Sequence, residues 1–362
     1  MGDYCPILRL QEKIDAGLDI MSGVHDVVKK ADLSIVNFEF AITDGSYKPI
    51  IKRGPNLQCK ENVVKVLKNA GFGLATFANN HSFDFGSEGL RKSIDVCHKN
   101  GLDTVGAGEN LQEAENVFYK KIKGETLAVI NCCEHEFSVT TGDFPGANPL
   151  NPIRQFYKIS EARKNADYVV VIVHGGHEMF QLPSPRMQEL YRYFIDVGAD
   201  AVINHHQHCY SGYEIHQGKP IFYGLGNFCF DEEGHNGDIW NYGLMVELIL
   251  SKCGIEYVIH PIEQCIEPEV RLSTRKEIIE RINELNKIIT DKKSLQKAVN
   301  EYYDSETRTC AREMEPLNNR YIRGLQIRGY LPSLLSKKWK LRALNYINCE
   351  AHRDKLINFL KS

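Results

Sequence analysis

The 362-residue chain lacks an apolar run of the length that a membrane-spanning helix needs, which is about 18 to 20 residues. Its first ten residues, MGDYCPILRL, contain neither the basic region nor the apolar core of an export signal. The 11 cysteines show no C-x-x-C spacing, and the adjacent Cys132 and Cys133 are poorly suited to an ordinary disulfide. We therefore expect a soluble cytoplasmic protein with reduced thiols and no direct membrane span.

The chain also lacks a strong excess of charge of either sign. It has 44 Lys and Arg against 47 Asp and Glu, a formal net charge of -3. This balance gives no general attraction to nucleic acid or to anionic membranes. We expect no nucleic-acid partner, and the sequence does not predict an oligomeric state.

Strand-like apolar runs alternate with helical patterns from Ala31 to about Ile221. Buried strands are predicted for the runs LSIVNFEF, FGLATFA and DYVVVIVHGG. Helices are predicted for ENVVKVLKNAG, SEGLRKSIDVCHKNG and PSPRMQELYRYFIDVG. FYKKIKGETLAVINCC predicts a hairpin, and the later runs YEIHQGKPIFYG and LMVELILSKCGIEYVIHPIE predict antiparallel pairs. The pattern indicates an α/β protein with mixed sheets and helices outside them.

Beyond about Arg271 the sequence becomes charged and helical, dotted with Leu and Ile, and carries no motif of its own. We therefore predict a catalytic domain over residues 1–270 and a helical extension over 271–362 that packs on it; the alternative is an independent functional module. Gly45 to Gly54 and Phe137 to Pro152, rich in Gly and Pro, predict long loops. Long loops in a compact domain often carry function.

The segment Asn204–His208 reads Asn-His-His-Gln-His directly after the apolar run Ala199–Ile203. On an extended segment His206 and His208 project the same way, so they can reach one shared centre. Neutral imidazole is the commonest protein metal ligand. A surface turn rich in histidine is the alternative.

Four predicted strands end in polar residues that can bind a ligand. These residues are Asn37 and Glu39; Asn79, Asn80 and His81; His174, His177 and Glu178; and His205, His206 and His208. Open α/β sheets bind ligands beyond the carboxyl ends of their strands, so we expect the four ends to converge. Taken singly, each has an ordinary explanation: a surface acid for Glu39, a turn at Asn79–His81, and a close backbone approach after His174.

The donor types in this set suit a divalent ion of borderline softness. Carboxylate, amide and imidazole ligands fit Mn, Fe or Zn, and the absence of clustered thiolates argues against a structural zinc site. One or two ions are compatible with the set. A carboxylate bridging two ions would help to activate a bound water near neutral pH, which is the chemistry of hydrolysis.

The motifs of the chain can be read together: GD near the start, NFE, ANNHSFDFG, HGGHE, and HHQH followed by GYEIHQGKPIFYGLGNFCFD. This combination resembles the bacterial capsule-synthesis CapA (PGA_cap) family. That family is linked to poly-γ-glutamate capsules and is similar to the calcineurin-like metallophosphoesterases. The resemblance covers roughly residues 2–250 and not the helical tail. It implies an α/β calcineurin-like metallophosphatase sandwich of two mixed β-sheets flanked by helices, with a C-terminal helical extension.

The resemblance also implies roles for individual residues. The implied metal ligands are Asp3, Glu39 as the bridging carboxylate, Asn80, His174, His206 and His208. His81 would protonate a leaving group, and Asp84 would hold its ring and favour its protonated form. Candidate substrate contacts are Arg9, Lys52 or Arg53, Glu178 and His205.

Two departures from the family pattern affect the expected site. Asn204 and Gln207 stand where the family has glycine and proline, which predicts a different turn geometry with both outer imidazoles retained. The strand expected to carry Asp3 is missing, because the chain begins almost at that residue. A terminal residue without a strand is poorly ordered, so we expect one weak metal position or a start placed too late.

Three functions follow from these observations. The leading hypothesis is a metal-dependent hydrolase that attacks a phosphoester, or an amide bond of an anionic polymer, with water. The alternative is a capsule or polyglutamate accessory protein that keeps the ligands but only binds the anionic polymer. Dinucleotide binding at Val105–Gly108 is the weakest, because this G-x-G lacks a third glycine and a downstream acid.

Overall fold

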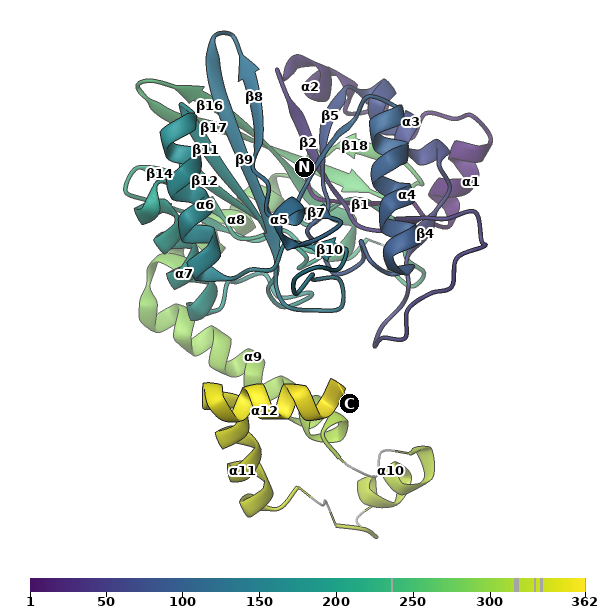
Figure 1. The fold of residues 1–362 in the computed structure, drawn as a ribbon, viewed down its shortest axis with the longest axis vertical. Coiled ribbons are helices and arrows are strands. Elements are labelled where there is room, and N and C mark those ends of the chain that lie inside the picture. Colours follow the sequence, from purple (N-terminus) through teal and green to yellow (C-terminus); the bar gives the residue numbers. More distant parts are fainter. Residues whose placement is uncertain (236, 316–318, 329, 333–334, 362) are drawn as a thin grey trace. The chain divides into compact units, whose positions relative to one another are not determined.

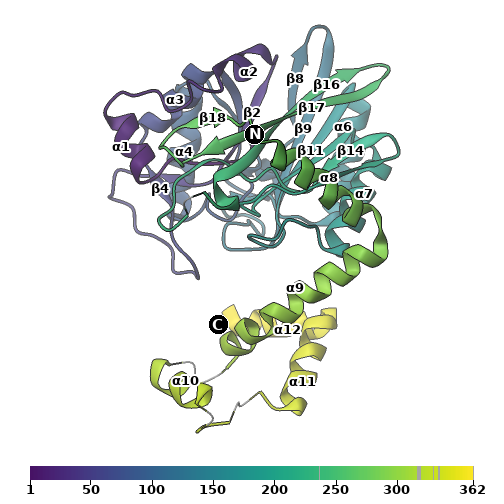
Figure 2. The same ribbon diagram turned by 180° about the vertical axis from the view of Figure 1, so that it is seen from behind.

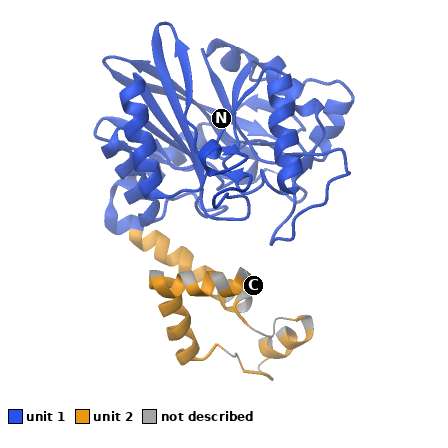
Figure 3. Cartoon of the chain, in the orientation of Figure 1, with its two compact units in different colours: residues 1–295 blue, residues 296–362 orange. Residues whose placement is uncertain are grey.

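The computed structural model describes residues 1–362 except 236, 316–318, 329, 333–334 and 362. The chain forms two compact units, Met1–Leu295 and Gln296–Ser362 (Figure 3). Helix α8 (Lys276–Thr290) belongs to the first unit, so the division falls about 25 residues after the predicted one. After it come helices α9 (Lys292–Glu313), α10 (Arg320–Ile327), α11 (Lys337–Asn348) and α12 (Glu350–Lys361). That this helical extension packs on the catalytic domain stays a prediction.

The first large sheet is parallel throughout. Its order is β15 (Asn227–Phe230), β1 (Asp3–Cys5), β2 (Ser34–Phe38), β5 (Phe72–Thr76) and β6 (Asp103–Val105). Helices α3 (Asn62–Ala70) and α4 (Gly86–Lys99) connect its strands. Helix α3 buries Val63, Val64 and Leu67 and ends at Gly71, whose φ of 107° requires glycine.

The second large sheet is mixed. Its order is β13 (Tyr213–His216), β14 (Lys219–Phe222), β12 (Ala201–His205), β11 (Tyr168–His174), β9 (Glu125–Cys133) and β8 (Phe118–Ile122). Its outer strands β13 and β8 are antiparallel to their neighbours. Helices α6 (Pro152–Asn165) and α7 (Pro185–Val197) accompany it, each opened by a side-chain cap, from Asn151 and Ser184 respectively, and a proline in the first turn.

The two large sheets face each other, with α3 and α4 outside one and α6 and α7 outside the other (Figures 1 and 2). A three-stranded antiparallel sheet of β16 (Tyr242–Ser251), β17 (Gly254–Gln264) and β18 (Val270–Leu272) adds to this core. One buried apolar cluster contains residues from all three sheets, among them Leu74, Val170, Ile203 and Leu244. The predicted α/β sandwich of two sheets flanked by helices is confirmed.

Short elements complete the first unit. They are α1 (Arg9–Asp15), α2 (His25–Lys30), β3 (Ala41–Ile42), β4 (Gln58–Cys59), β7 (Ala107–Gly108), α5 (Leu111–Ala114), β10 (Gly146–Ala147) and a 3₁₀ turn at Ile239–Asn241. Among the residues that the structure describes, no helix combines the length and the apolar character needed to cross a bilayer.

The expectation of a missing first strand is wrong. Strand β1 is only three residues long, yet it lies between β2 and β15 and pairs with both. Asp3 sits opposite Asn37 on one side and Asn227 on the other, and its side chain is fully buried. Gly2 permits this approach, since a Cβ there would lie 1.8 Å from the carbonyl oxygen of Gly226. Parallel neighbours on both sides therefore order the residue without a longer strand.

Candidate metal centre

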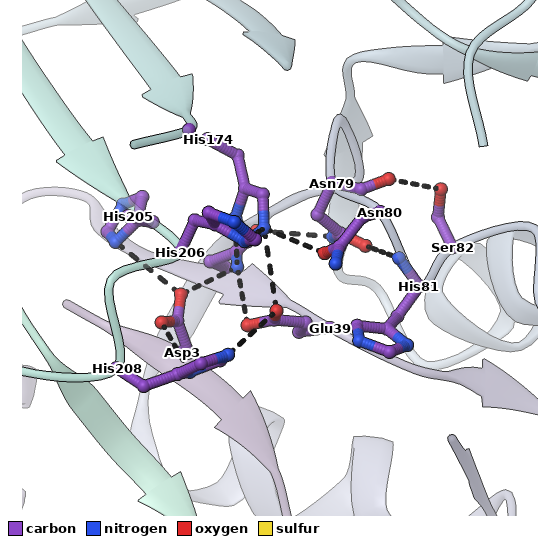
Figure 4. A network of polar contacts seen from close by, with 12 residues as sticks. Asp3, Glu39, Asn79, Asn80, His81, Ser82, His174, His205, His206 and His208 are labelled. Carbon is purple, nitrogen blue, oxygen red and sulfur yellow. Dashed lines mark hydrogen bonds and ion pairs between the residues drawn. The ribbon is translucent and has the colours of Figure 1, made fainter. Parts of the chain in front are cut away.

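The predicted ligands come together where strands of the two large sheets end. Asp3 lies on β1, Glu39 follows β2, Asn80 follows β5 and His174 closes β11. His206 and His208 follow β12. All six side chains are buried, and Figure 4 shows them grouped around Glu39. The predicted convergence of separate strand ends is therefore present in the fold.

One group of ligand atoms surrounds Nε2 of His174. Oδ1 of Asn80 lies 2.9 Å from this nitrogen, Nδ1 of His206 lies 3.1 Å away, and Oε1 of Glu39 lies 3.4 Å away. Each of these atoms carries a lone pair when the imidazoles are neutral and suitably protonated. Four lone pairs directed at one small volume are the arrangement that a divalent ion requires.

A second group lies on the other side of Glu39. Nδ1 of His208 is 3.4 Å from Oδ2 of Asp3, and Nε2 of the same ring is 3.7 Å from Oε1 of Glu39. Ligand atoms of Glu39, His206 and His208 lie within 4.8 Å of one another, as do those of Asp3, Glu39 and His174. Oε1 of Glu39 is therefore shared between two possible ion positions.

The carboxylates themselves test whether the site fits a cation. Oδ2 of Asp3 and Oε1 of Glu39 are buried and accept no hydrogen bond of ordinary geometry from any described residue. A buried carboxylate oxygen left in this state is costly unless a cation or a donor satisfies it. The donor set and these two oxygens fit a divalent metal.

Burial shifts the titration of the whole cluster. Burial, together with the neighbouring Asp3, raises the pKa of Glu39 well above its ordinary value. Burial lowers the pKa of His174 and of His206, and it lowers the pKa of His205 to about 4. These imidazoles are therefore neutral near pH 7, which is the form that ligates metals.

Asn227 orients His208 and was missed by the sequence analysis. Its Oδ1 lies 2.9 Å from Nδ1 of His208, while its amide nitrogen donates to the carbonyl oxygens of His208 and Trp240. Those two bonds fix the amide, so Nδ1 of His208 carries a proton and, in the neutral ring, Nε2 keeps its lone pair toward Glu39. Burial lowers the pKa of His208, but Asp3 outweighs burial and the pKa is raised. The only signal in the sequence is a polar residue inside the apolar run GLGNFCF.

His81 lies at the other end of the cluster from His205 (Figure 4). Its Nδ1 is 2.7 Å from Oδ2 of Asp84 and 3.2 Å from Nζ of Lys52. Burial lowers the pKa of His81, and although Asp84 opposes this shift, Lys52 adds to it. Asp84 does favour the charged form of His81, as expected. Burial and Lys52 together outweigh this effect, so the net shift of the His81 pKa is downward.

The histidine segment is a turn and not the extended strand that we expected. His206 has φ of 93° and His208 has φ of 52°, in a region that residues other than glycine rarely adopt. Gln207 stabilises the turn by donating to the carbonyl oxygens of Phe180 and Leu182. Both imidazoles reach the cluster through this turn and not by alternation along a strand.

The candidate substrate contacts divide into two groups. Arg9 makes a bidentate ion pair with Asp231 and also donates to the carbonyl of Cys265, so its donors are engaged away from the ligand atoms. His205 is buried with Nδ1 3.8 Å from Oδ1 of Asp3, and its substrate-binding role stays a prediction. Arg53 and Glu178 are exposed, and their substrate-binding role stays a prediction.

The glycines of Val105–Gly108 serve packing. A Cβ on Gly106 would lie 2.0 Å from Oδ1 of Asn131, and one on Gly108 would lie 2.5 Å from Cβ of Glu113. The backbone there is already filled by neighbouring side chains. The structure therefore adds no support to dinucleotide binding at this segment.

In this two-sheet α/β sandwich, carboxylate, amide and imidazole groups converge at strand ends, where open α/β sheets bind their ligands. The family model of the bacterial capsule synthesis protein PGA_cap matches residues 2–232, so the chain belongs to that family. The sequence motifs predicted this family.

Two relatives agree with this assignment. The capsule biosynthesis protein CapA of Bacillus anthracis is 35% identical over 221 residues, which cover 59% of this chain and 54% of that protein. The PGA biosynthesis protein CapA of Bacillus subtilis (strain 168) is 35% identical over 241 residues, covering 64% and 61% respectively. The chain thus spans little more than half of these relatives. A solved structure of a hypothetical protein from Thermus thermophilus is 16% identical, with a TM-score of 0.43 over 72% of this chain and 97% of that one.

Proposed function

We propose that the protein is a metal-dependent hydrolase that uses water to cleave a phosphoester, or an amide bond of an anionic polymer. The observation that carries this proposal is Oε1 of Glu39, buried without an ordinary hydrogen bond between two groups of ligand atoms and shared by both. We expect two ions of Mn, Fe or Zn, although one would also fit the donors. When bound, such ions lower the pKa of a coordinated water and so supply a nucleophile near neutral pH.

The protein's own residues hold the centre and handle the proton. The residues that would hold the metal are Asp3, Glu39, Asn80, His174, His206 and His208. His81 would protonate the leaving group from its doubly protonated form, which burial opposes and Asp84 favours. Because its Nδ1 faces Asp84, Nε2 is the ring nitrogen available to the substrate.

The substrate class is inferred from the relatives and from the surface beside the centre. The printed names of the two Bacillus relatives refer to capsule and PGA biosynthesis, which supports an anionic polymer such as poly-γ-glutamate, or a small anionic ester. Arg53 is exposed next to Lys52 and is the cation that we assign to substrate binding.

The experiment is turnover by protein reconstituted with Mn²⁺, Fe²⁺ or Zn²⁺, with bis(4-nitrophenyl) phosphate and a γ-linked glutamate oligomer as substrates. We expect hydrolysis of at least one of them, abolished by chelation. At unchanged metal content, His81→Ala should strongly reduce cleavage of the γ-amide, whose amine leaving group needs a proton, and should reduce cleavage of the nitrophenyl diester far less. Full metal content with no turnover of any ester or γ-amide would refute the hydrolase. It would instead support an accessory protein that binds the polymer.

A further inference from the structure

A buried lysine lies beside the His81 and Asp84 pair and enters from a loop. Lys52 belongs to the segment 43–57 that joins β3 to β4, and its side chain is only 1% exposed. The preceding residue Ile51 is fully exposed, so the loop turns outward immediately before the lysine turns inward. A buried lysine is rare unless it is paired. Here Nζ forms an ion pair with Oδ1 of the fully buried Asp84.

Asp84 connects this loop to His81. Its Oδ2 accepts from the backbone N–H of Leu57 at 2.6 Å and lies 2.7 Å from Nδ1 of His81. Its carbonyl oxygen accepts from the N–H of Ile50 at 2.9 Å. Asp84 therefore contacts both ends of the segment 50–57, and it also contacts the side chains of Lys52 and His81.

Lys52 is placed to act on His81 and not on a substrate. Nζ lies 3.2 Å from Nδ1 of His81, on the side of the ring that faces Asp84. The ammonium group also lies over the ring of Phe137, with Nζ 5.5 Å from the ring centroid. An ammonium group enclosed in this way holds the Asp84 side chain in place through their ion pair without reaching open solvent.

We propose that Lys52 is a positioning residue: through Asp84 it holds His81 with Nε2 turned toward the metal centre and couples the loop 50–57 to the proton donor. This proposal rests on the proposed hydrolytic function, in which His81 protonates the leaving group. A group that acts only through the proton donor matters most when the leaving group is poor, since a good leaving group departs without protonation.

The test compares Lys52→Met with Lys48→Met, which removes an exposed lysine from the same loop. Full-length, metal-loaded proteins are assayed on two diesters, one releasing 4-nitrophenolate and one releasing an alkoxide. For Lys52→Met we expect kcat to fall about 10- to 100-fold on the alkyl ester and less than about threefold on the nitrophenyl ester. Lys52→Arg should recover most of the loss, because it retains the cation, and Lys48→Met should behave as wild type on both esters.

The double variant Lys52→Met/Asp84→Asn guards against simple misfolding, since it leaves no unpaired buried charge. It should fold and show the same dependence on the leaving group as Lys52→Met and Asp84→Asn do singly. Each of the three variants lacks the ion pair between Lys52 and Asp84, so the losses should not add. Equal losses on both esters, or unchanged kcat on the alkyl ester at full metal content, would overturn the proposal.

A crystal structure of full-length Lys52→Met tests the same idea without turnover. We expect the contact between His81 and Asp84 to be lost or lengthened and the segment 50–57 to move. An unchanged contact and loop would overturn the role of Lys52 even if the wild type hydrolyses esters. Absence of turnover by the metal-loaded wild type would refute the hydrolase alone.

Discussion

Replacing Glu39 with glutamine should have opposite effects on the metal-free and the metal-loaded protein. In the metal-free protein the carboxyl is buried beside Asp3 and its pKa is raised, so the charge at this position is unfavourable. A neutral amide of the same shape removes that cost. With metal present, the same substitution removes the ligand shared by both groups of donors.

The size of the effect follows from binding linkage. Metal at 100 times its Kd stabilises the folded state by about 2.7 kcal/mol, and a variant with about 100-fold weaker binding keeps only about 0.4 kcal/mol at that concentration. At about 2–4 °C per kcal/mol for a domain of this size class, the wild-type Tm should rise by about 5–10 °C and that of Glu39→Gln by about 1 °C. The metal-free variant should melt no lower than the metal-free wild type.

The assay is thermal unfolding followed by circular dichroism after chelation and after addition of Mn²⁺ or Zn²⁺. Glu88→Gln is the matched control, because it removes an exposed carboxylate of the same unit that is outside the ligand cluster. A wild-type Tm that does not respond to either metal, or a full response in Glu39→Gln, would refute the reasoning.

Three further predictions follow from the site. His81→Asn should lower kcat on an alkyl ester by about 10²- to 10⁴-fold with metal content unchanged, and equal loss of metal by elemental analysis would contradict a role in proton transfer. Asn227→Leu should weaken metal binding by about 10- to 100-fold in a calorimetric titration, because Nδ1 of His208 loses its acceptor; unchanged affinity would remove Asn227 from the site. The pKa of His205, lowered to about 4 from 6.5, means that the folded state binds fewer protons than the unfolded state between these pH values. The free energy of unfolding of the metal-free protein should therefore rise with pH in that window, by about 3 kcal/mol from this residue, and His205→Asn should flatten the slope in urea titrations.

The strand ends could be predicted because each is marked in the local sequence by an apolar run followed by polar residues. Apolar runs that stop at Glu39, Asn80 and His174 mark the carboxyl ends of buried parallel strands, and such ends meet at one edge. The helix and strand order up to Ile221 followed from the same periodicity. Periodicity therefore placed these polar residues at strand ends before any long-range contact was known.

Other parts of the site depend on contacts between distant segments. Lys52 lies on an irregular loop, and only the folded chain brings it to Asp84. Asn227 looks like an interruption in an apolar run until β15 is seen beside β1. The positive φ of His206 depends on hydrogen bonds that Gln207 makes to a separate loop. Sequence patterns carry no information on such tertiary partners.

The most direct test is anomalous diffraction from a crystal soaked in Mn²⁺. We predict one or two peaks beside Glu39, each within coordinating distance of side chains from the set Asp3, Asn80, His174, His206 and His208. A well-ordered crystal without an anomalous peak between these side chains would contradict the account.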